Sequence, residues 1–197
     1  MPLTLLQNPY EMFDEWFQKA VKDEPVDPNA MSLSTIDQDG RPSSRMVLLK
    51  TFDEIGFVFF TNYNSRKGKA MEANPNVALL FYWKSQNRQV RIEGRIEKVD
   101  SSISDTYFNS RHPQSRIGAW ASQQSELLES RDVLVNRFKE YESKFDGDNI
   151  PRPPHWGGFR VTPDYFEFWQ AGEYRLHDRG IYTKNTQGDW HIQRLNP

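Results

Sequence analysis

Apolar positions near the N-terminus recur with the period of an amphipathic helix. Asn8 followed by Pro9 is typical of a helix start, because asparagine caps the first turn and proline suits its first position. The apolar face is formed by Phe13, Trp16, Phe17, Ala20 and Val21. These positions share one side of a helix, so we expect a helix over about 8–22, ended by Pro25 and Pro28.

From residue 31 onward, short apolar runs alternate with turn residues, which is typical of antiparallel hairpins. The pattern predicts strands at 31–36, 44–50, 57–61, 77–83, 89–99, 159–161, 165–169, 180–184 and 190–195. Further helices are expected at 65–74, where Ser65 can cap the first turn, at 101–110 and at 130–145. Short strands with inserted helices favour a closed or partly closed antiparallel barrel in one domain, 1–197.

Composition narrows the possible functions. Hydrophobic residues make up 37% and aromatic residues 14% of the chain, which is enough for a packed core. The net charge of −2 provides no general basic field for nucleic acid, and the absence of cysteine excludes thiol chemistry and disulfides. The chain has neither a run of about 18 apolar residues nor the pattern of a signal peptide, so we expect a cytoplasmic protein.

Several common catalytic and binding motifs are missing from the sequence. Neither the glycine-rich dinucleotide fingerprint nor the P-loop pattern occurs. The histidines lack metal-ligand spacing, so no metal site is expected, and no nucleophile elbow is present.

Cationic and aromatic residues nevertheless gather in a few segments. Ser65, Arg66 and Lys67 open a predicted helix, where hydroxyl, backbone N–H groups and positive charge favour a phosphate. The alternative is an ordinary solvated basic face. Two further groups have the same character, and their members are Tyr107, Arg111 and Ser115 in the first, and Trp169, Arg175, His177 and Arg179 in the second. If 175–179 is extended, the last three side chains share one face and suit an anionic ligand; a surface strand with Asp178 pairing one arginine is the alternative.

Taken together, these segments resemble the pyridoxine/pyridoxamine 5′-phosphate oxidase family over nearly the whole chain. The motifs that carry the resemblance are RMVLLK at 45–50, FTN at 60–62 with SRK at 65–67, RQVR at 88–91 with EG at 93–94, YFNSR at 107–111, GAWAS at 118–122 with QS at 124–125, PPHWGG at 153–158, EFWQ at 167–170, RLHDR at 175–179 and RLNP at 194–197. Each motif is weak alone, but their shared order along the chain is specific.

The resemblance implies a mainly β fold, an FMN-binding split β-barrel (antiparallel, Greek-key-like) with peripheral helices. It also implies a homodimer with its FMN sites at the interface, and a C-terminal strand region at about 156–197 that completes each site. By resemblance, the cofactor-binding residues are Arg45, Met46, Val47, Leu48, Leu49, Lys50, Phe60, Thr61, Ser65, Arg66, Lys67, Gln89, Gln124, Ser125, Trp169 and Arg179. The substrate-binding residues are Lys50, Tyr107, Arg111, Ser115, Arg175, Leu176 and His177, with Arg175 and His177 as the catalytic pair over the pyridine ring.

The implied reaction belongs to vitamin B6 metabolism. FMN would accept a hydride equivalent from C4′ of pyridoxine or pyridoxamine 5′-phosphate, and O2 would reoxidise the flavin with release of H2O2. The amine substrate would also release ammonia. Two alternatives stay open: a split-barrel flavin reductase that acts on another substrate, and a pyridoxal-phosphate- or flavin-binding protein without turnover.

Overall fold

The computed structural model describes residues 3–145 and 149–197, so the first two residues of the N-terminal segment lie outside the described residues. The helices are α1 (Pro9–Asp23), α2 (Arg66–Ala73), α3 (Ser101–Ser110), α4 (Pro113–Ala121) and α5 (Arg131–Lys144). The strands are β1 (Ala30–Ile36), β2 (Pro42–Leu48), β3 (Thr51–Phe52), β4 (Phe57–Asn62), β5 (Asn76–Trp83), β6 (Arg88–Lys98), β7 (Trp156–Gln170), β8 (Asp178–Lys184) and β9 (Trp190–Leu195). No helix in these ranges is long and apolar enough to cross a membrane.

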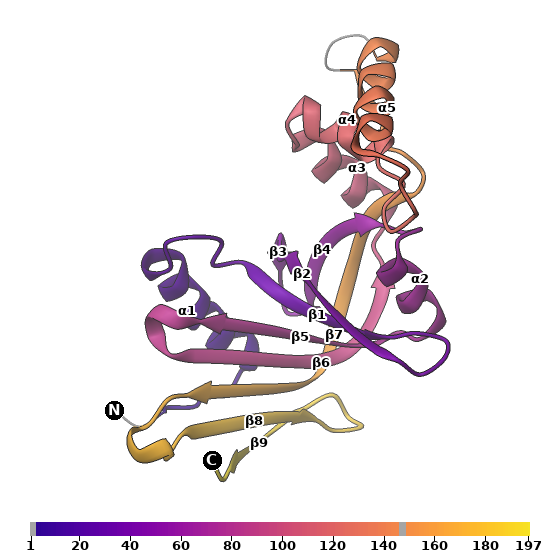
Figure 1. Cartoon of the computed structure of the whole chain (residues 1–197). Helices are drawn as coiled ribbons and strands as arrows, with labels where there is room; N and C mark the ends of the chain where they lie inside the picture. Colours follow the sequence, from indigo (N-terminus) through magenta and orange to yellow (C-terminus); the bar gives the residue numbers. More distant parts are fainter. Residues whose placement is uncertain (1–2, 146–148) are drawn as a thin grey trace.

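All strands belong to one antiparallel sheet that curls on itself, which confirms the predicted barrel class (Figure 1). Neighbouring strands follow the order β2-β1-β5-β6-β7-β4-β3, and β8 and β9 extend the sheet from β7. The long strand β7 pairs with β4 through its first half and with β8 through its second half, while β6 pairs with it along both halves. The hairpin β8–β9 therefore projects from the part of the sheet opposite α3–α5 (Figure 1).

The main core is formed where α1 packs against side chains of the sheet. Asn8 caps this helix through a 2.8 Å bond from the backbone N–H of Tyr10, as the sequence predicts. Phe13 and Trp16 are buried, but Val21 remains 50% exposed, so its predicted place on the buried face is wrong. A smaller core under α3–α5 contains Phe108, Ile117, Ile150 and Trp156.

The strands predicted at 159–161 and 165–169 form one continuous strand. Pro163 lies between the two predicted strands, and a bulge opposite Glu93 and Gly94 accommodates it within β7. Strand β2 also ends at Leu48, two residues before the predicted boundary. Helix α4 was not predicted, because its apolar residues do not form a clear helical stripe.

Candidate functional site

A cavity of about 510 Å³ lies between the strands β2 and β4 and the helices α3 and α4. Its size is typical of ligand pockets. It brings together eleven of the predicted site residues, namely Met46, Val47, Leu48, Lys50, Phe60, Thr61, Lys67, Tyr107, Arg111, Ser115 and Gln124. The remaining lining residues are Asn62, Gly118, Ala119, Ser122 and Trp156, which sequence reasoning did not assign to the site although all five lie in the family motifs.

The Lys67 ammonium is one of the two cationic groups that line this cavity. Ser65 caps α2 by accepting a 3.2 Å bond from the backbone N–H of Gly68, which places Lys67 in the first turn. The Lys67 Nζ donates to Thr61 Oγ1 at 3.1 Å and to Gln124 Oε1 at 2.7 Å. Both acceptors are neutral. Burial, and secondarily the charge of Arg45, lower the pKa of Lys67 to about 8, so an anion would stabilise the charged form here.

The same cavity is also lined by Arg111, directly after α3. Its guanidinium lies 4.8 Å from the centre of the Trp156 ring, and its Nη1 is buried without a hydrogen-bond partner among the described residues. Ser115 lies nearby in the first turn of α4, and Lys50 Nζ lies 5.9 Å from the Tyr107 ring centre. Burial lowers the pKa of Arg111, but a guanidinium stays charged at neutral pH. Its free donor is therefore suited to an anionic ligand.

Three aromatic rings line the wall beside Arg111. Phe60 stacks on Tyr107 with ring centres 4.0 Å apart and on Trp156 with centres 5.5 Å apart. The three planes are nearly parallel, since Tyr107 and Trp156 differ by only 8°. This stack fixes the Tyr107 hydroxyl and the Trp156 face against which Arg111 lies. Trp156 belongs to the PPHWGG motif, and a tryptophan beside two glycines was the signal that could have identified it.

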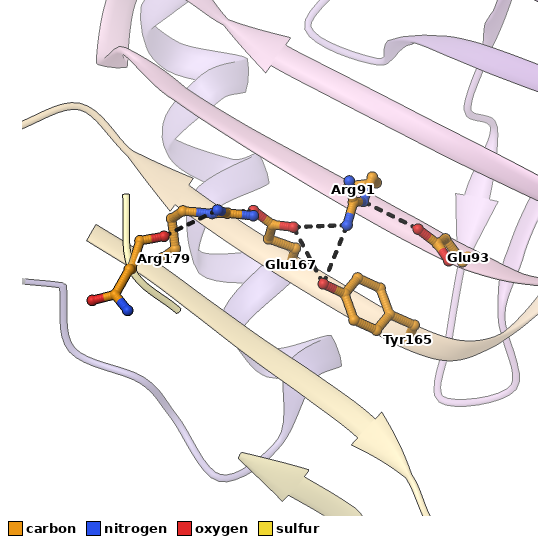
Figure 2. A network of polar contacts seen from close by, with 6 residues as sticks. Arg91, Glu93, Tyr165, Glu167 and Arg179 are labelled. Carbon is orange, nitrogen blue, oxygen red and sulfur yellow. Dashed lines mark hydrogen bonds and ion pairs between the residues drawn. The ribbon is translucent and has the colours of Figure 1, made fainter. Parts of the chain in front are cut away.

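A second group of predicted residues lies on another part of the sheet. Gln89 and Trp169 line a recess of about 160 Å³ together with Leu80, Arg91 and Glu167. Beside it, Arg179 Nε donates to Glu167 Oε1 at 2.7 Å (Figure 2).

The extended backbone expected for 175–179 is wrong, because part of this segment lies in the loop between β7 and β8. A 3₁₀ turn (Glu173–Arg175) reverses the chain, and Tyr174 and Arg175 adopt left-handed backbone conformations with φ of 54° and 65°. Such values are strained for residues with side chains and are frequent at functional sites. His177 lies against Trp169 with ring centres 4.7 Å apart, whereas Leu176 is 71% exposed. Arg175 is exposed as well, so within one chain this loop lies outside the 510 Å³ cavity.

The other predicted residues lie around α2 and β2 without lining that cavity. Arg45 donates to Leu33 O at 3.0 Å and Thr35 Oγ1 at 2.8 Å, and Leu49 is buried in the main core. Arg66 lies 3.6 Å from Asp37 and lines a separate cavity together with Ser125. One chain therefore brings the Lys67 and Arg111 groups together in the 510 Å³ cavity, but not all of the predicted site residues.

Comparison with known proteins identifies two matching family models. The model described as pyridoxamine 5′-phosphate oxidase matches residues 17–145. The model described as the pyridoxine 5′-phosphate oxidase C-terminal dimerisation region matches residues 156–197. The second match covers β7, β8 and β9 and therefore includes Trp169, Arg175, His177 and Arg179.

Similar proteins cover nearly the full chain. The pyridoxine/pyridoxamine 5′-phosphate oxidase of Nostoc punctiforme is 55% identical over 190 residues, which are 96% of this chain and 89% of that protein. The protein of the same name from Burkholderia thailandensis is 56% identical over 192 residues, or 96% of this chain and 89% of its own.

Solved structures support the same fold. PhzG from Burkholderia lata 383, in complex with tetrahydrophenazine-1-carboxylic acid, superimposes with a TM-score of 0.91 at 30% identity, covering 98% of this chain and 94% of its own. A pyridoxamine 5′-phosphate oxidase-related, FMN-binding protein from Nostoc punctiforme superimposes with a TM-score of 0.76 at 16% identity, covering 98% of this chain and 99% of its own. These likenesses confirm the split-barrel class.

Proposed function

The chain belongs to the pyridoxamine 5′-phosphate oxidase family, and on this premise we propose that it oxidises pyridoxine or pyridoxamine 5′-phosphate to pyridoxal 5′-phosphate. FMN is the proposed cofactor and O2 the proposed electron acceptor. The alcohol would yield the aldehyde and H2O2, and the amine would consume water and also yield ammonia. This chemistry would place the protein in vitamin B6 metabolism.

The observation that carries the proposal is the presence of two separate cationic groups in one cavity. Lys67 lies there among neutral acceptors, and Arg111 lines the same cavity with a buried Nη1 that has no hydrogen-bond partner in the described part of the chain. FMN and the proposed substrate each bear one phosphate, and each phosphate needs positive charge and N–H donors. A cavity that contains both cationic groups is suited to both molecules, with their flat rings between the phosphates.

The residues present fit FMN around Lys67. The donor set of Lys67, Thr61 and Ser65 suits a phosphate, and the Gln124 oxygen now bonded to Lys67 shows that the ammonium already holds an acceptor. Around the rest of the cofactor we propose Arg45 to Lys50, Phe60, Arg66, Gln89, Gln124, Ser125, Trp169 and Arg179. When bound, FMN supplies the two-electron acceptor for the C4′ hydride and the group that O2 reoxidises.

The residues of the chain have binding and orienting roles in this proposal. Lys50, Tyr107, Arg111 and Ser115 would hold the substrate phosphate, while Arg175, Leu176 and His177 would cover its pyridine ring. Arg175 would favour charge movement at C4′ by its fixed positive charge. Rate enhancement would come mainly from stacking two rings in the correct orientation.

We further propose a homodimer in which each site is shared. The 510 Å³ cavity and the Gln89–Trp169 recess are separate in one chain, and the matched dimerisation region contains Trp169 and Arg175. The outer sheet face between them exposes apolar side chains, with Met46 at 63% and Tyr82 at 57% exposure. An isologous dimer across this face would cover these side chains and could bring one protomer's recess to its partner's cavity.

The likeness to PhzG raises a second candidate substrate, a reduced aromatic carboxylic acid without phosphate. The cavity around Arg111 favours the phosphorylated pyridine, because Lys50, Tyr107 and Ser115 line the same cavity and supply further hydrogen-bond donors. A carboxylate could engage fewer of them. A flavin reductase with another substrate and a binding protein without turnover remain the other outcomes.

An anaerobic absorbance titration tests the proposal. The protein is reconstituted with FMN, and its flavin band is followed after addition of pyridoxine 5′-phosphate, with unphosphorylated pyridoxine as the matched control. We expect bleaching with the phosphate ester and recovery of the band, with H2O2, when air is admitted. Bleaching only by a reduced phenazine-type acid would favour the second candidate. A bound flavin that none of these compounds reduces would leave a binding protein, and failure to bind FMN would refute the proposal.

A further inference from the structure

Glu167 is a buried acid in the second half of β7, and its side chain is only 7% exposed. It lies between Arg179 of β8 and Arg91 of β6, the two strands that flank β7 (Figure 2). Burying a carboxylate is unfavourable unless cations and hydrogen bonds compensate it. Neither the sequence motifs nor the proposed reaction gives this acid a role.

The two carboxylate oxygens have separate partners. Oε1 accepts from Arg179 Nε at 2.7 Å. Oε2 lies 2.8 Å from Arg91 Nη2 and accepts a 3.2 Å bond from the Tyr165 hydroxyl. Burial alone raises the pKa of Glu167, but the hydrogen bond from Arg179 and the charge of Arg91 outweigh it and hold that pKa below its usual range. Glu167 is therefore ionised at neutral pH.

Arg179 is held at two edges by these contacts. Arg179 Nε donates to Glu167 Oε1, and Arg179 Nη1 donates to the backbone carbonyl of Asn196 at 3.0 Å. These bonds fix the guanidinium plane and leave Nη2 outside both of them. A long arginine side chain has many rotamers, so holding it in one orientation before a ligand arrives reduces the entropy lost on binding.

The arrangement lies beside the recess that the proposed function assigns to the flavin. Glu167 and Arg91 line this recess together with Gln89 and Trp169, and Trp169 is the register partner of Arg179. Glu167 is thus in a position to act on the flavin through Arg179.

We infer that Glu167 is a positioning residue, which holds Arg179 in the orientation that receives FMN. The inference rests on the proposed function, because it assumes that the recess faces a flavin. Charge and orientation have opposite consequences here. If Glu167 acted only by its negative charge, removing that charge would strengthen binding of the anionic cofactor. If it positions Arg179, the same change weakens binding.

The test compares FMN affinity, followed by quenching of flavin fluorescence, in full-length variants. We expect Glu167→Gln to weaken binding by about tenfold, since the hydrogen bond from Arg179 loses its charge assistance. Glu93→Gln is the matched control, because Glu93 pairs with Arg91 at 3.2 Å on the same face, whereas the carboxylate bonded to Arg179 is that of Glu167. It should leave affinity unchanged.

A double-mutant cycle separates positioning from a merely structural effect. In an Arg179→Ala background, Glu167→Gln should cause no further loss of FMN affinity, because Glu167 acts through the missing side chain. An equal loss in both backgrounds, or unchanged or tighter binding in the single variant, would overturn the inference. If Glu167→Gln does not fold, Glu167→Asp carries the same cycle. Failure of the unmodified protein to bind FMN would instead reject the proposed function.

Discussion

At the residue scale, the lowered pKa of Lys67 makes a prediction about pH. Because this pKa is about 8, the free protein loses the ammonium charge as pH rises from 7 to 9. A bound phosphate favours the protonated form, so FMN affinity should fall through this interval. Fluorescence titrations at several pH values, with protein folding checked at each, measure the effect.

The matched variant for this prediction is Lys67→Arg. A guanidinium stays protonated over the same range, so the affinity of this variant should be nearly independent of pH, whatever its absolute value. The same steep decline in both proteins would mean that another group controls binding.

Gly68 provides a residue-scale prediction about stability. A Cβ at this position would lie 2.0 Å from the backbone carbonyl oxygen of Tyr63, which cannot move away as a flexible side chain could. We expect Gly68→Ala to lower the free energy of unfolding by about 1–3 kcal/mol, as overpacking does. Urea denaturation measures this change.

Gly118 in α4 is the control for that measurement. A Cβ there would meet no atom of the described residues within 4 Å. Alanine favours a helix over glycine, so Gly118→Ala should leave stability unchanged or raise it by about 0.5–1 kcal/mol. If both variants lost stability equally, close approach to Tyr63 would not be the cause.

At the scale of elements, β8 holds the N-terminal segment against the sheet. The Tyr182 hydroxyl donates to the backbone carbonyl of Leu6 at 2.7 Å, and Asp178 accepts from the backbone N–H of Leu3 at 3.1 Å. Burial raises the pKa of Tyr182 to about 12, so its hydroxyl remains a donor at neutral pH. Tyr182→Phe should therefore destabilise the protein by about 1 kcal/mol in urea denaturation.

Tyr174 is the comparison for this variant, because its side chain is 90% exposed. Tyr174→Phe should not change the denaturation midpoint. Equal midpoints for Tyr182→Phe and the unmodified protein would show that the bond to Leu6 contributes no net stability.

The sequence predicted elements best where a local signal defines them. Asn8 and Ser65 cap α1 and α2 as expected, since a capping side chain needs only its own first turn. Helix α4 lacks a periodic apolar stripe, and the continuity of β7 through Pro163 depends on its bulge with β6. The reversal at Tyr174 and Arg175 was missed because no glycine marks its left-handed backbone.

The same difference applies to the candidate site at the scale of the molecule. Motif order grouped residues that one chain divides between two cavities, with Arg111 in one and Trp169 in the other. Local patterns carry no information about which copy of a chain supplies a side chain. The division becomes visible only when strand pairing places the second half of β7, together with β8, away from the cavity beside α3.

This division makes a final prediction about subunits. If each site takes Arg111 from one protomer and Trp169 from the other, Arg111→Ala and Trp169→Ala should each lose oxidase activity as separate homodimers. A heterodimer of the two variants contains one site with both changes and one site with neither. Co-expression with random assortment should therefore recover about a quarter of the unmodified activity, measured as H2O2 release with pyridoxine 5′-phosphate.

The control is co-expression of Arg111→Ala with Lys67→Ala, because Lys67 and Arg111 line the same cavity of one chain. Their heterodimer has one change in each site and should recover nothing. Equal recovery in both pairs would mean that activity arises from residual function of the variants, or that Lys67 and Arg111 of one site come from different protomers. Absence of recovery with Trp169→Ala, despite confirmed heterodimers, would place both residues of a site in the same protomer.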